Sequence, residues 1–256
     1  MLSRLYSIKF IIGVALVWLG ILAYGLAIYS TQVYHDHAIQ TQLDTLKIQI
    51  EQESDLAVQD LYSNLKLFAL RLQTEAPFAQ ALTEGDPVAM EAWLGKTYTR
   101  YQVSRGMFRL KAILVRDLSG GVLAHSSVDG LDNYAGCSEV LKSLHGSPIR
   151  VLKPRYALCS FDNQLFAEVL VPVGTLEPRA YLHIIADAAE GLGNIESRIG
   201  MPLSVQHGSG EPLFQSAQWL ESNDEAYLYP AYKLYGDDAF LGATITAAYD
   251  QRPLVE

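Results

Sequence analysis

The hydrophobic pattern opens with one long stretch, residues 10–34, that contains no formally charged side chain. Its first nineteen residues are almost all apolar or Gly, and a helix of about 20 such residues crosses the hydrocarbon core of a bilayer with its backbone hydrogen bonds satisfied. Arg4 and Lys9 precede the stretch, and the next basic residue is Lys47. The positive-inside rule therefore predicts a transmembrane helix over 10–34, a cytoplasmic N-terminus (1–9) and a periplasmic or extracellular remainder.

The alternative to a retained membrane anchor is a cleaved signal peptide. The apolar core of a signal peptide runs for about 7–15 residues and ends at a cleavage site of small residues. The stretch in this chain is longer, and its small residues stand among Tyr and Ile. The pattern favours a retained anchor.

A second long stretch, residues 35–76, has apolar residues mostly at steps of three or four with a break near residues 53–54, and no Gly or Pro interrupts it before Pro77. This spacing predicts a stalk helix that continues from the span. The first half carries a narrow apolar stripe, which predicts a homodimer formed through the stalk. The apolar stripe of the second half is broader, and we expect that half of the helix to pack on a folded domain. The alternative is a helix that packs on its own domain throughout. The predicted dimer seam consists of Ile39, Leu43, Leu46 and Ile50.

The hydrophobic period changes after residue 107. Two short helices are predicted within residues 78–107, with a turn at 84–87, and alternating strand-like runs follow. A five-stranded antiparallel sheet with a helical layer is the simplest closed arrangement, and it defines a module over residues 77–187. The predicted strands are 111–117, 122–127, 149–161, 164–174 and 180–187, with a turn at 118–121 and a short helix at 138–145.

A shorter version of the same order recurs in residues 188–256. A helical connector over 188–199 leads into a hairpin with a turn at 207–210, and strands at 226–235 and 240–249 follow. The hairpin sequences VRDLSGGVLAHSS and VQHGSGEPLFQS are similar, which predicts a structural repeat. The predicted fold class is therefore α+β, with a membrane span, a stalk and two modules built on antiparallel sheets.

Charge and motifs narrow the possible functions. The formal net charge is −9, which argues against nucleic acid and against anionic lipid surfaces as partners. The sequence contains no HExxH, no P-loop, no G-x-S-x-G and no dinucleotide fingerprint. We therefore expect a protein that is not an enzyme and that has neither a metal site nor a cofactor.

The chain has two cysteines, Cys137 and Cys159, and the predicted topology places both outside the cytoplasm. An oxidising compartment allows such a pair to form a disulfide, which would constrain the unfolded chain by about 3 kcal/mol. The alternative is two buried free thiols. The sequence predicts the disulfide.

The order of these elements, from about Ile8 to Asp250, resembles the extracytoplasmic sensing region of the double Cache superfamily. Such regions occur in bacterial chemoreceptors, sensor kinases and diguanylate cyclases. The resemblance implies a PAS-like membrane-distal module around 111–187 and a smaller proximal one around 202–250, in a protein of the bacterial inner membrane. It also implies that a small ligand binds the distal module, between the sheet and its covering helices and loops.

The chain departs from that family in two respects. A known amino-acid-binding motif of the family runs Tyr-x-x-x-x-Arg-x-Trp-Tyr, whereas Tyr101 and Arg105 stand one residue closer and Phe108 replaces the Trp-Tyr pair. Amino-acid sensing by that motif is therefore not supported. The chain also has a single span and no output domain, so we expect either a truncated receptor or an anchor that works through a partner. The alternative to a sensor is an accessory or structural subunit that uses the same fold to bind a protein partner.

Ligand pockets are mostly apolar, with a few polar groups that fix the orientation of the ligand. Arg105 is the candidate for a ligand carboxylate or phosphate, because its planar guanidinium suits bidentate contacts. Asp187 could pair with a ligand cation, but its position before a predicted helix favours the role of an N-cap. The candidate ligand-binding residues are Tyr101, Arg105, Tyr134, Tyr156 and Asp187.

Overall fold

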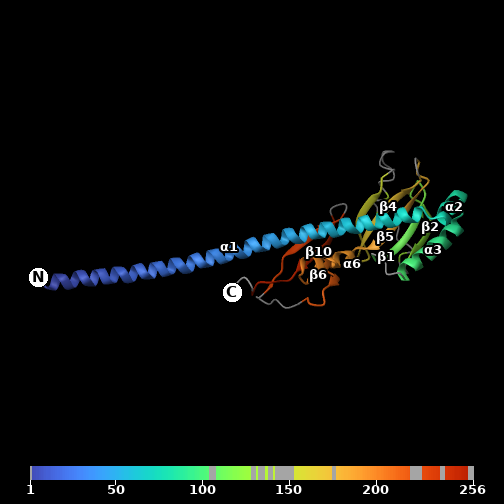
Figure 1. Ribbon diagram of the computed structural model, residues 1–256. Helices are drawn as coiled ribbons and strands as arrows, with labels where there is room; N and C mark the ends of the chain where they lie inside the picture. Colours follow the sequence, from blue (N-terminus) through green and yellow to red (C-terminus); the bar gives the residue numbers. More distant parts are fainter. Residues whose placement is uncertain are drawn as a thin grey trace. The chain divides into compact units, whose positions relative to one another are not determined.

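The chain forms one long helix followed by two main antiparallel sheets, of five and four strands (Figure 1). The computed structural model describes residues 2–103, 108–127, 131, 136–137, 141, 153–174, 177–219, 227–236 and 240–252. Within these, the chain divides into two compact units, residues 1–46 and 47–256. The first helix, α1 (Leu2–Gln73), contributes to both units.

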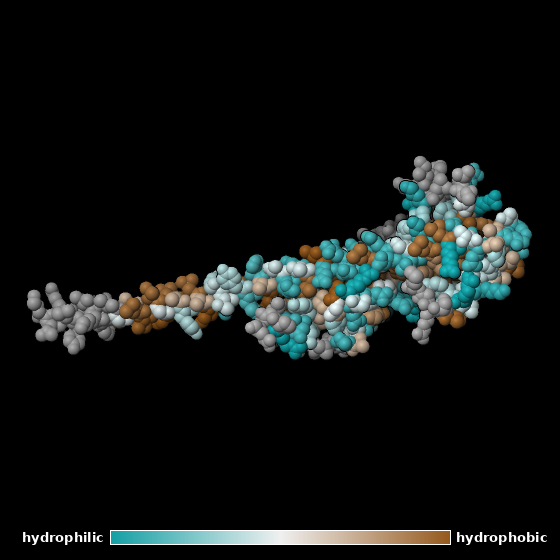
Figure 2. Space-filling model, in the orientation of Figure 1, coloured by the Kyte–Doolittle hydropathy of each residue, from teal (hydrophilic) through white to brown (hydrophobic). Residues whose placement is uncertain are grey.

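The first unit contains the apolar stretch. Residues 13–34 of α1 are helical with exposed side chains, and apolar residues gather along this part of the helix (Figure 2). In the described part of the chain, α1 is the one helix that is long and apolar enough to cross a membrane. Side chains that remain apolar and exposed over this length fit a lipid environment better than water.

The second unit begins with the remainder of α1, which packs on the domain. Leu61, Leu65 and Leu72 are buried in the main hydrophobic core, as the broad apolar stripe predicted. Leu46 and Ile50 are 4 and 0% exposed, and Ile50 belongs to the same core, so the assignment of these two residues to the dimer seam was wrong. The domain extends further along the helix than the narrowing of the stripe suggested.

Two short helices follow α1, at the predicted positions. They are α2 (Ala76–Glu84) and α3 (Pro87–Val103). Pro77 lies in the first turn of α2, where its missing N–H costs no hydrogen bond. Gly85 ends α2 in the left-handed conformation, and the carboxylate of Asp86 caps α3 by accepting hydrogen bonds from the N–H groups of residues 88 and 89.

The first sheet has five antiparallel strands in the order β2-β1-β5-β4-β3. Its helical layer is formed by α1, α2 and α3, and α3 lies beside β1 and β2 (Figure 1). The predicted sheet is confirmed, while the predicted helix at 138–145 lies outside the described residues apart from residue 141, which is helical. The strands are β1 (Leu110–Arg116), β2 (Val122–Ser127), β3 (Arg155–Phe161), β4 (Gln164–Val173) and β5 (Ala180–Asp187).

The second sheet repeats this topology with one strand fewer, in the order β7-β6-β10-β9. The connector before it forms two short helices, α6 (Ala188–Gly193) and α7 (Ile195–Ile199). In each sheet the first hairpin forms one edge and its first strand pairs with the last long strand. The strands are β6 (Leu203–His207), β7 (Pro212–Gln215), β9 (Ala231–Tyr235) and β10 (Leu241–Ala247).

The two hairpin turns share one hydrogen-bonding pattern. Asp117 and His207 each donate their N–H across the turn, to Gly121 and Glu211, over 2.8 and 2.7 Å. Each turn contains a Gly with a φ angle near +90°. The repeat predicted from the two hairpin sequences is therefore confirmed at the level of the backbone.

The last two predicted strands are each divided. Pro230 separates β8 (Tyr227–Leu228) from β9, and β11 (Tyr249–Asp250) follows β10 after one residue. The short strands β8 and β11 pair with each other and form a separate two-stranded sheet. Proline cannot donate the hydrogen bond that a continuous strand would need at this point.

Candidate functional site

The distal sheet buries its two faces differently. Because side chains alternate along a strand, β1, β4 and β5 each present one set to α1 and another set to the opposite face. The set facing α1 is apolar and belongs to the main core. On the opposite face, two small apolar clusters, one around Cys137 and Leu170 and one around Leu114 and Phe166, accompany three buried polar residues.

These three residues, Arg116, Glu168 and His183, form what we call the ionic network. They come from β1, β4 and β5, which are neighbours in the sheet, and they are 2, 0 and 0% exposed. The Nε of Arg116 donates to Nδ1 of His183 over 3.1 Å. The Nε2 of His183 and the Oε2 of Glu168 lie 2.8 Å apart. A second guanidinium nitrogen of Arg116 donates to the carbonyl of Gly120 over 2.8 Å.

The hydrogen bonds of the network define its protonation. Since Arg116 can only donate, Nδ1 of His183 is the acceptor and Nε2 carries the proton, which it donates to the Glu168 carboxylate. The network therefore combines one cation, one anion and a neutral imidazole. Burial lowers the pKa of the Arg116 guanidinium, while the negative charges of Glu168 and Asp117 act to raise it.

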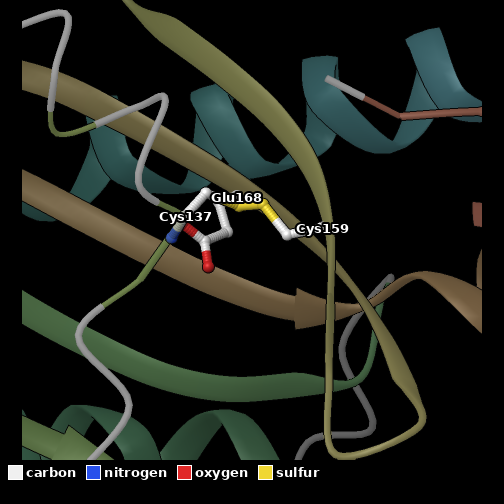
Figure 3. Close-up of side chains that lie close together, drawn as sticks. All are labelled: Cys137, Cys159 and Glu168. Carbon is white, nitrogen blue, oxygen red and sulfur yellow. A yellow bond between two sulfur atoms is a disulfide. The ribbon is translucent and has the colours of Figure 1, made fainter. Parts of the chain in front are cut away.

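The network also holds the segment that contains Cys137. The backbone N–H of Cys137 donates to Oε2 of Glu168 over 2.9 Å, and a disulfide joins Cys137 to Cys159 on β3 (Figure 3). The predicted disulfide is thus confirmed, with a Cα–Cα distance of 6.0 Å that is ordinary for such bonds. The two sulfurs and the Glu168 carboxylate lie within 4.8 Å of one another. Sulfurs joined to each other cannot serve as thiolate ligands, so this group is not a metal centre.

Gly136 allows the segment to approach the network closely. Its φ angle is +92°, and a Cβ atom at this position would lie 2.6 Å from Cε1 of His183. Any other residue would therefore strain the backbone and collide with the imidazole ring. The close contact between segment and network depends on this glycine.

Of the five predicted ligand-binding residues, two meet at one cavity. Tyr101, near the end of α3, and Asp187, at the end of β5, both line a cleft of 1090 Å³. The opposite side of the cleft is formed by α6, α7 and β7, with Phe214 among its lining residues. The cleft therefore lies where the two modules meet.

Asp187 has several structural partners in this position. Its carboxylate accepts a hydrogen bond from the N–H of Ala189 over 3.0 Å and so caps α6. The same carboxylate lies 3.3 Å from Nζ of Lys111 and 4.0 Å from a guanidinium nitrogen of Arg109. The N-cap alternative considered for Asp187 is thus present, and its charge is already matched.

The other predicted residues do not join this cleft in the part of the chain that the structure describes. Tyr156 lies on β3 facing α1, with its ring 5.1 Å from that of Tyr62. Arg105 and Tyr134 lie outside the described residues.

The ionic network was missed by the sequence analysis, although a signal was present. Glu168 and His183 stand as polar residues inside apolar strand runs, and Arg116 ends the apolar run of β1. Charged residues are rarely buried unless they are paired, so three such positions in three strands of one sheet could have been read as partners. The sequence does not show the order of the strands, so it could not show that these three residues are neighbours in the sheet.

Comparison with solved structures gives matches over most of the chain, although no family model and no curated protein matches the sequence. The periplasmic domain of LuxQ from Vibrio cholerae aligns with a TM-score of 0.50 at 11% identity, covering 80% of this chain and 97% of that one. A domain of a putative sensory box/GGDEF family protein from Vibrio parahaemolyticus aligns with a TM-score of 0.47 at 9% identity, covering 85% of this chain and 99% of that one. The sensory domain of the Campylobacter jejuni chemoreceptor Tlp3 with isoleucine bound aligns with a TM-score of 0.45 at 12% identity, covering 85% of this chain and 96% of that one.

At these identities the comparison establishes the fold alone. The long N-terminal helix, the five-stranded sheet and the smaller repeated sheet are the features that the resemblance to double Cache domains implied. The match to LuxQ covers nearly the whole of that periplasmic domain. This chain therefore has the fold of the LuxQ periplasmic domain, with the two modules that the resemblance to double Cache regions implied.

Proposed function

We propose that this protein is the extracytoplasmic, ligand-sensing region of a bacterial signal-transduction protein and that its role is binding rather than catalysis. The observation that carries the proposal is the double Cache-type fold joined to an apolar N-terminal helix. The alternative, an accessory subunit that binds a protein partner through the same fold, is separated from it by the ligand experiment below.

We infer that the ligand acts on the sheet face that carries the ionic network. Burying charged groups costs several kcal/mol per ion, and packed apolar residues would often stabilise a core as well or better. Burying Arg116 and Glu168 with His183 therefore costs free energy that an apolar core would not cost, which points to a role beyond stability. The network connects three strands to the Cys137 segment through Glu168. A ligand that took one of these hydrogen bonds would release or shift that segment.

The cleft that contains Tyr101 and Asp187 is the competing position for the ligand. Gln102 and Phe108 line it, and the predicted Arg105 falls between them in the sequence.

The two positions are distinguished by a thermal-shift screen of the full chain against small metabolites. If the ligand acts on the network face, His183→Gln should abolish the shift and Arg105→Ala should preserve it. The opposite outcome would assign the ligand to the cleft. A screen without any shift would favour the accessory subunit.

We further propose a single-pass topology with the N-terminus in the cytoplasm and the folded region in the periplasm. The support is the charge-free stretch and the basic residues Arg4 and Lys9 on one side of it. An alkaline phosphatase fused after Glu256 is expected to be active, because the enzyme requires the periplasm to form its disulfides. A fusion that is expressed in full but inactive would contradict this topology.

The predicted homodimer requires a different surface of α1, since Ile50 faces the core. Beyond residue 46, six exposed and uncharged residues recur at steps of three or four along the helix and form what we call the outer stripe. In a chain with a net charge of −9, an uncharged stripe is where two copies can approach with least repulsion. The residues of the outer stripe are Ile48, Gln52, Leu56, Gln59, Ser63 and Leu67.

Disulfide crosslinking in membranes measures this dimer directly. Cysteines placed singly at Gln52 or Gln59 are expected to crosslink two copies efficiently, because facing positions of a helix pair come close together. Lys47 and Glu51 are exposed and lie roughly 80–140° around the helix from Gln52 and Gln59, so they serve as controls. Equal crosslinking at all four positions would show that the stripe is not an interface.

A further inference from the structure

A second cavity lies on the opposite side of the distal sheet from the ionic network, between α1 and α3. Its volume is 520 Å³, within the usual range for small-molecule sites. Most of its lining is apolar, whereas the larger cleft beside Asp187 is lined by several carboxylates and amides. The apolar part is formed by Leu67, Phe68, Leu72, Tyr101 and Phe108.

Three aromatic rings form one wall of this cavity. The ring of Phe68 on α1 lies 4.7 Å from that of Tyr101 and 5.6 Å from that of Phe108, and the latter two are 5.0 Å apart. The Tyr101 hydroxyl accepts a hydrogen bond from the N–H of Phe108 over 3.2 Å, which fixes the ring. The wall is therefore a prearranged surface on which an apolar or aromatic group can pack in tilted or edge-on contact.

The charges at the cavity are unequal. Arg100 on α3 is paired with Glu75 over 2.9 Å. Arg71, in the last turn of α1, also lines the cavity, and its guanidinium makes no hydrogen bond or ion pair to any residue that the structure describes. The three ionised groups sum to one positive charge. An anionic group beside Arg71 would find a planar donor without competition from a neighbouring acid.

We propose that this cavity binds a small organic acid with an aromatic or short apolar body, its ring against Phe68, Tyr101 and Phe108 and its carboxylate on Arg71. Such a ligand would contact α1 and α3 at once. The site is independent of the proposed ligand position on the network face, because the sheet separates them.

Isothermal titration calorimetry of the full chain in lipid nanodiscs, with three probes of matched shape, tests the proposal. Phenylacetate is the anion, phenylacetamide the neutral analogue and phenethylamine the cation. Phenylacetate is expected to bind, and the other two to bind at least about tenfold more weakly, because each lacks the charge-assisted hydrogen bond. Arg71→Glu should reduce phenylacetate affinity by at least about tenfold and improve that of phenethylamine.

The controls separate this site from general effects. Lys66→Glu makes the same charge reversal on the same helix without lining the cavity, and it should leave phenylacetate affinity unchanged. Glu84→Gln, on α2 and away from every residue that lines the cavity, should likewise leave it unchanged; neither control variant touches the ionic network, so failure of the network-face proposal and failure of this one can be told apart. The proposal is overturned if phenylacetate does not bind at about 10 mM, if all three probes bind equally, or if Arg71→Glu has no effect.

Discussion

Replacing Glu168 with alanine is expected to destabilise the folded domain by about 3–5 kcal/mol. The substitution removes the carboxylate that balances Arg116 and accepts hydrogen bonds from His183 and from the N–H of Cys137. These groups stay buried without their partner, and the desolvation of the guanidinium is no longer compensated. Urea-induced unfolding of the full chain in detergent, followed by tryptophan fluorescence, measures the difference in the free energy of unfolding.

Two variants make this measurement interpretable. Glu168→Gln keeps the size of the side chain and one acceptor, so its loss should be smaller than that of the alanine variant. Glu177→Ala removes a carboxylate from an exposed position and should change stability by no more than about 0.5 kcal/mol. A loss below about 1 kcal/mol for Glu168→Ala would contradict the prediction and would mean that the network contributes little to stability.

Removing the disulfide should have an effect of similar size. The variant with Cys137→Ser and Cys159→Ser is expected to lose about 2–5 kcal/mol, because the bond joins residues 22 positions apart and so restricts the unfolded chain. The same unfolding experiment measures this loss. Mass spectrometry of the unreduced wild-type chain should first show a mass two hydrogens below that of the dithiol.

The disulfide and the network should also act together. Both hold the segment at Cys137, one through its sulfur and the other through its N–H on Glu168. The cost of Glu168→Ala should therefore be smaller in the disulfide-free chain, with a coupling of about 0.5–3 kcal/mol in the double-mutant cycle. Fully additive losses would show that the two attachments are independent.

Much of the architecture followed from local sequence patterns. The turn at residues 84–87 was readable because Gly85 and Asp86 suit the end of one helix and the start of the next. The hairpin turns were readable for the same reason, since their Gly residues adopt φ angles near +90°. The break between β8 and β9 was also readable, because Pro230 has no N–H to donate to a neighbouring strand, but the predicted strand ran through it.

The candidate sites were less predictable. Tyr101 and Asp187 do line one cleft, but Tyr156 faces α1, because one-residue steps along β3 alternate between the two sheet faces. Which face carries a ligand depends on what covers it. A strand pattern that is apolar on both faces, as in β4 and β5, does not contain that information.

By itself, then, the sequence determined the elements of this protein: an apolar helix, a helix with one buried face, two similar hairpins and two sheets. Periodicity and turn chemistry act between residues a few positions apart, and they are visible in any short window. The tertiary structure alone decided that Arg116 meets His183, 67 residues away, and that His183 meets Glu168 across β4 and β5. It also turned Ile50 inward and left Arg71 beside three aromatic rings. Strand order and register bring such residues together through long-range pairing, and local periodicity specifies neither.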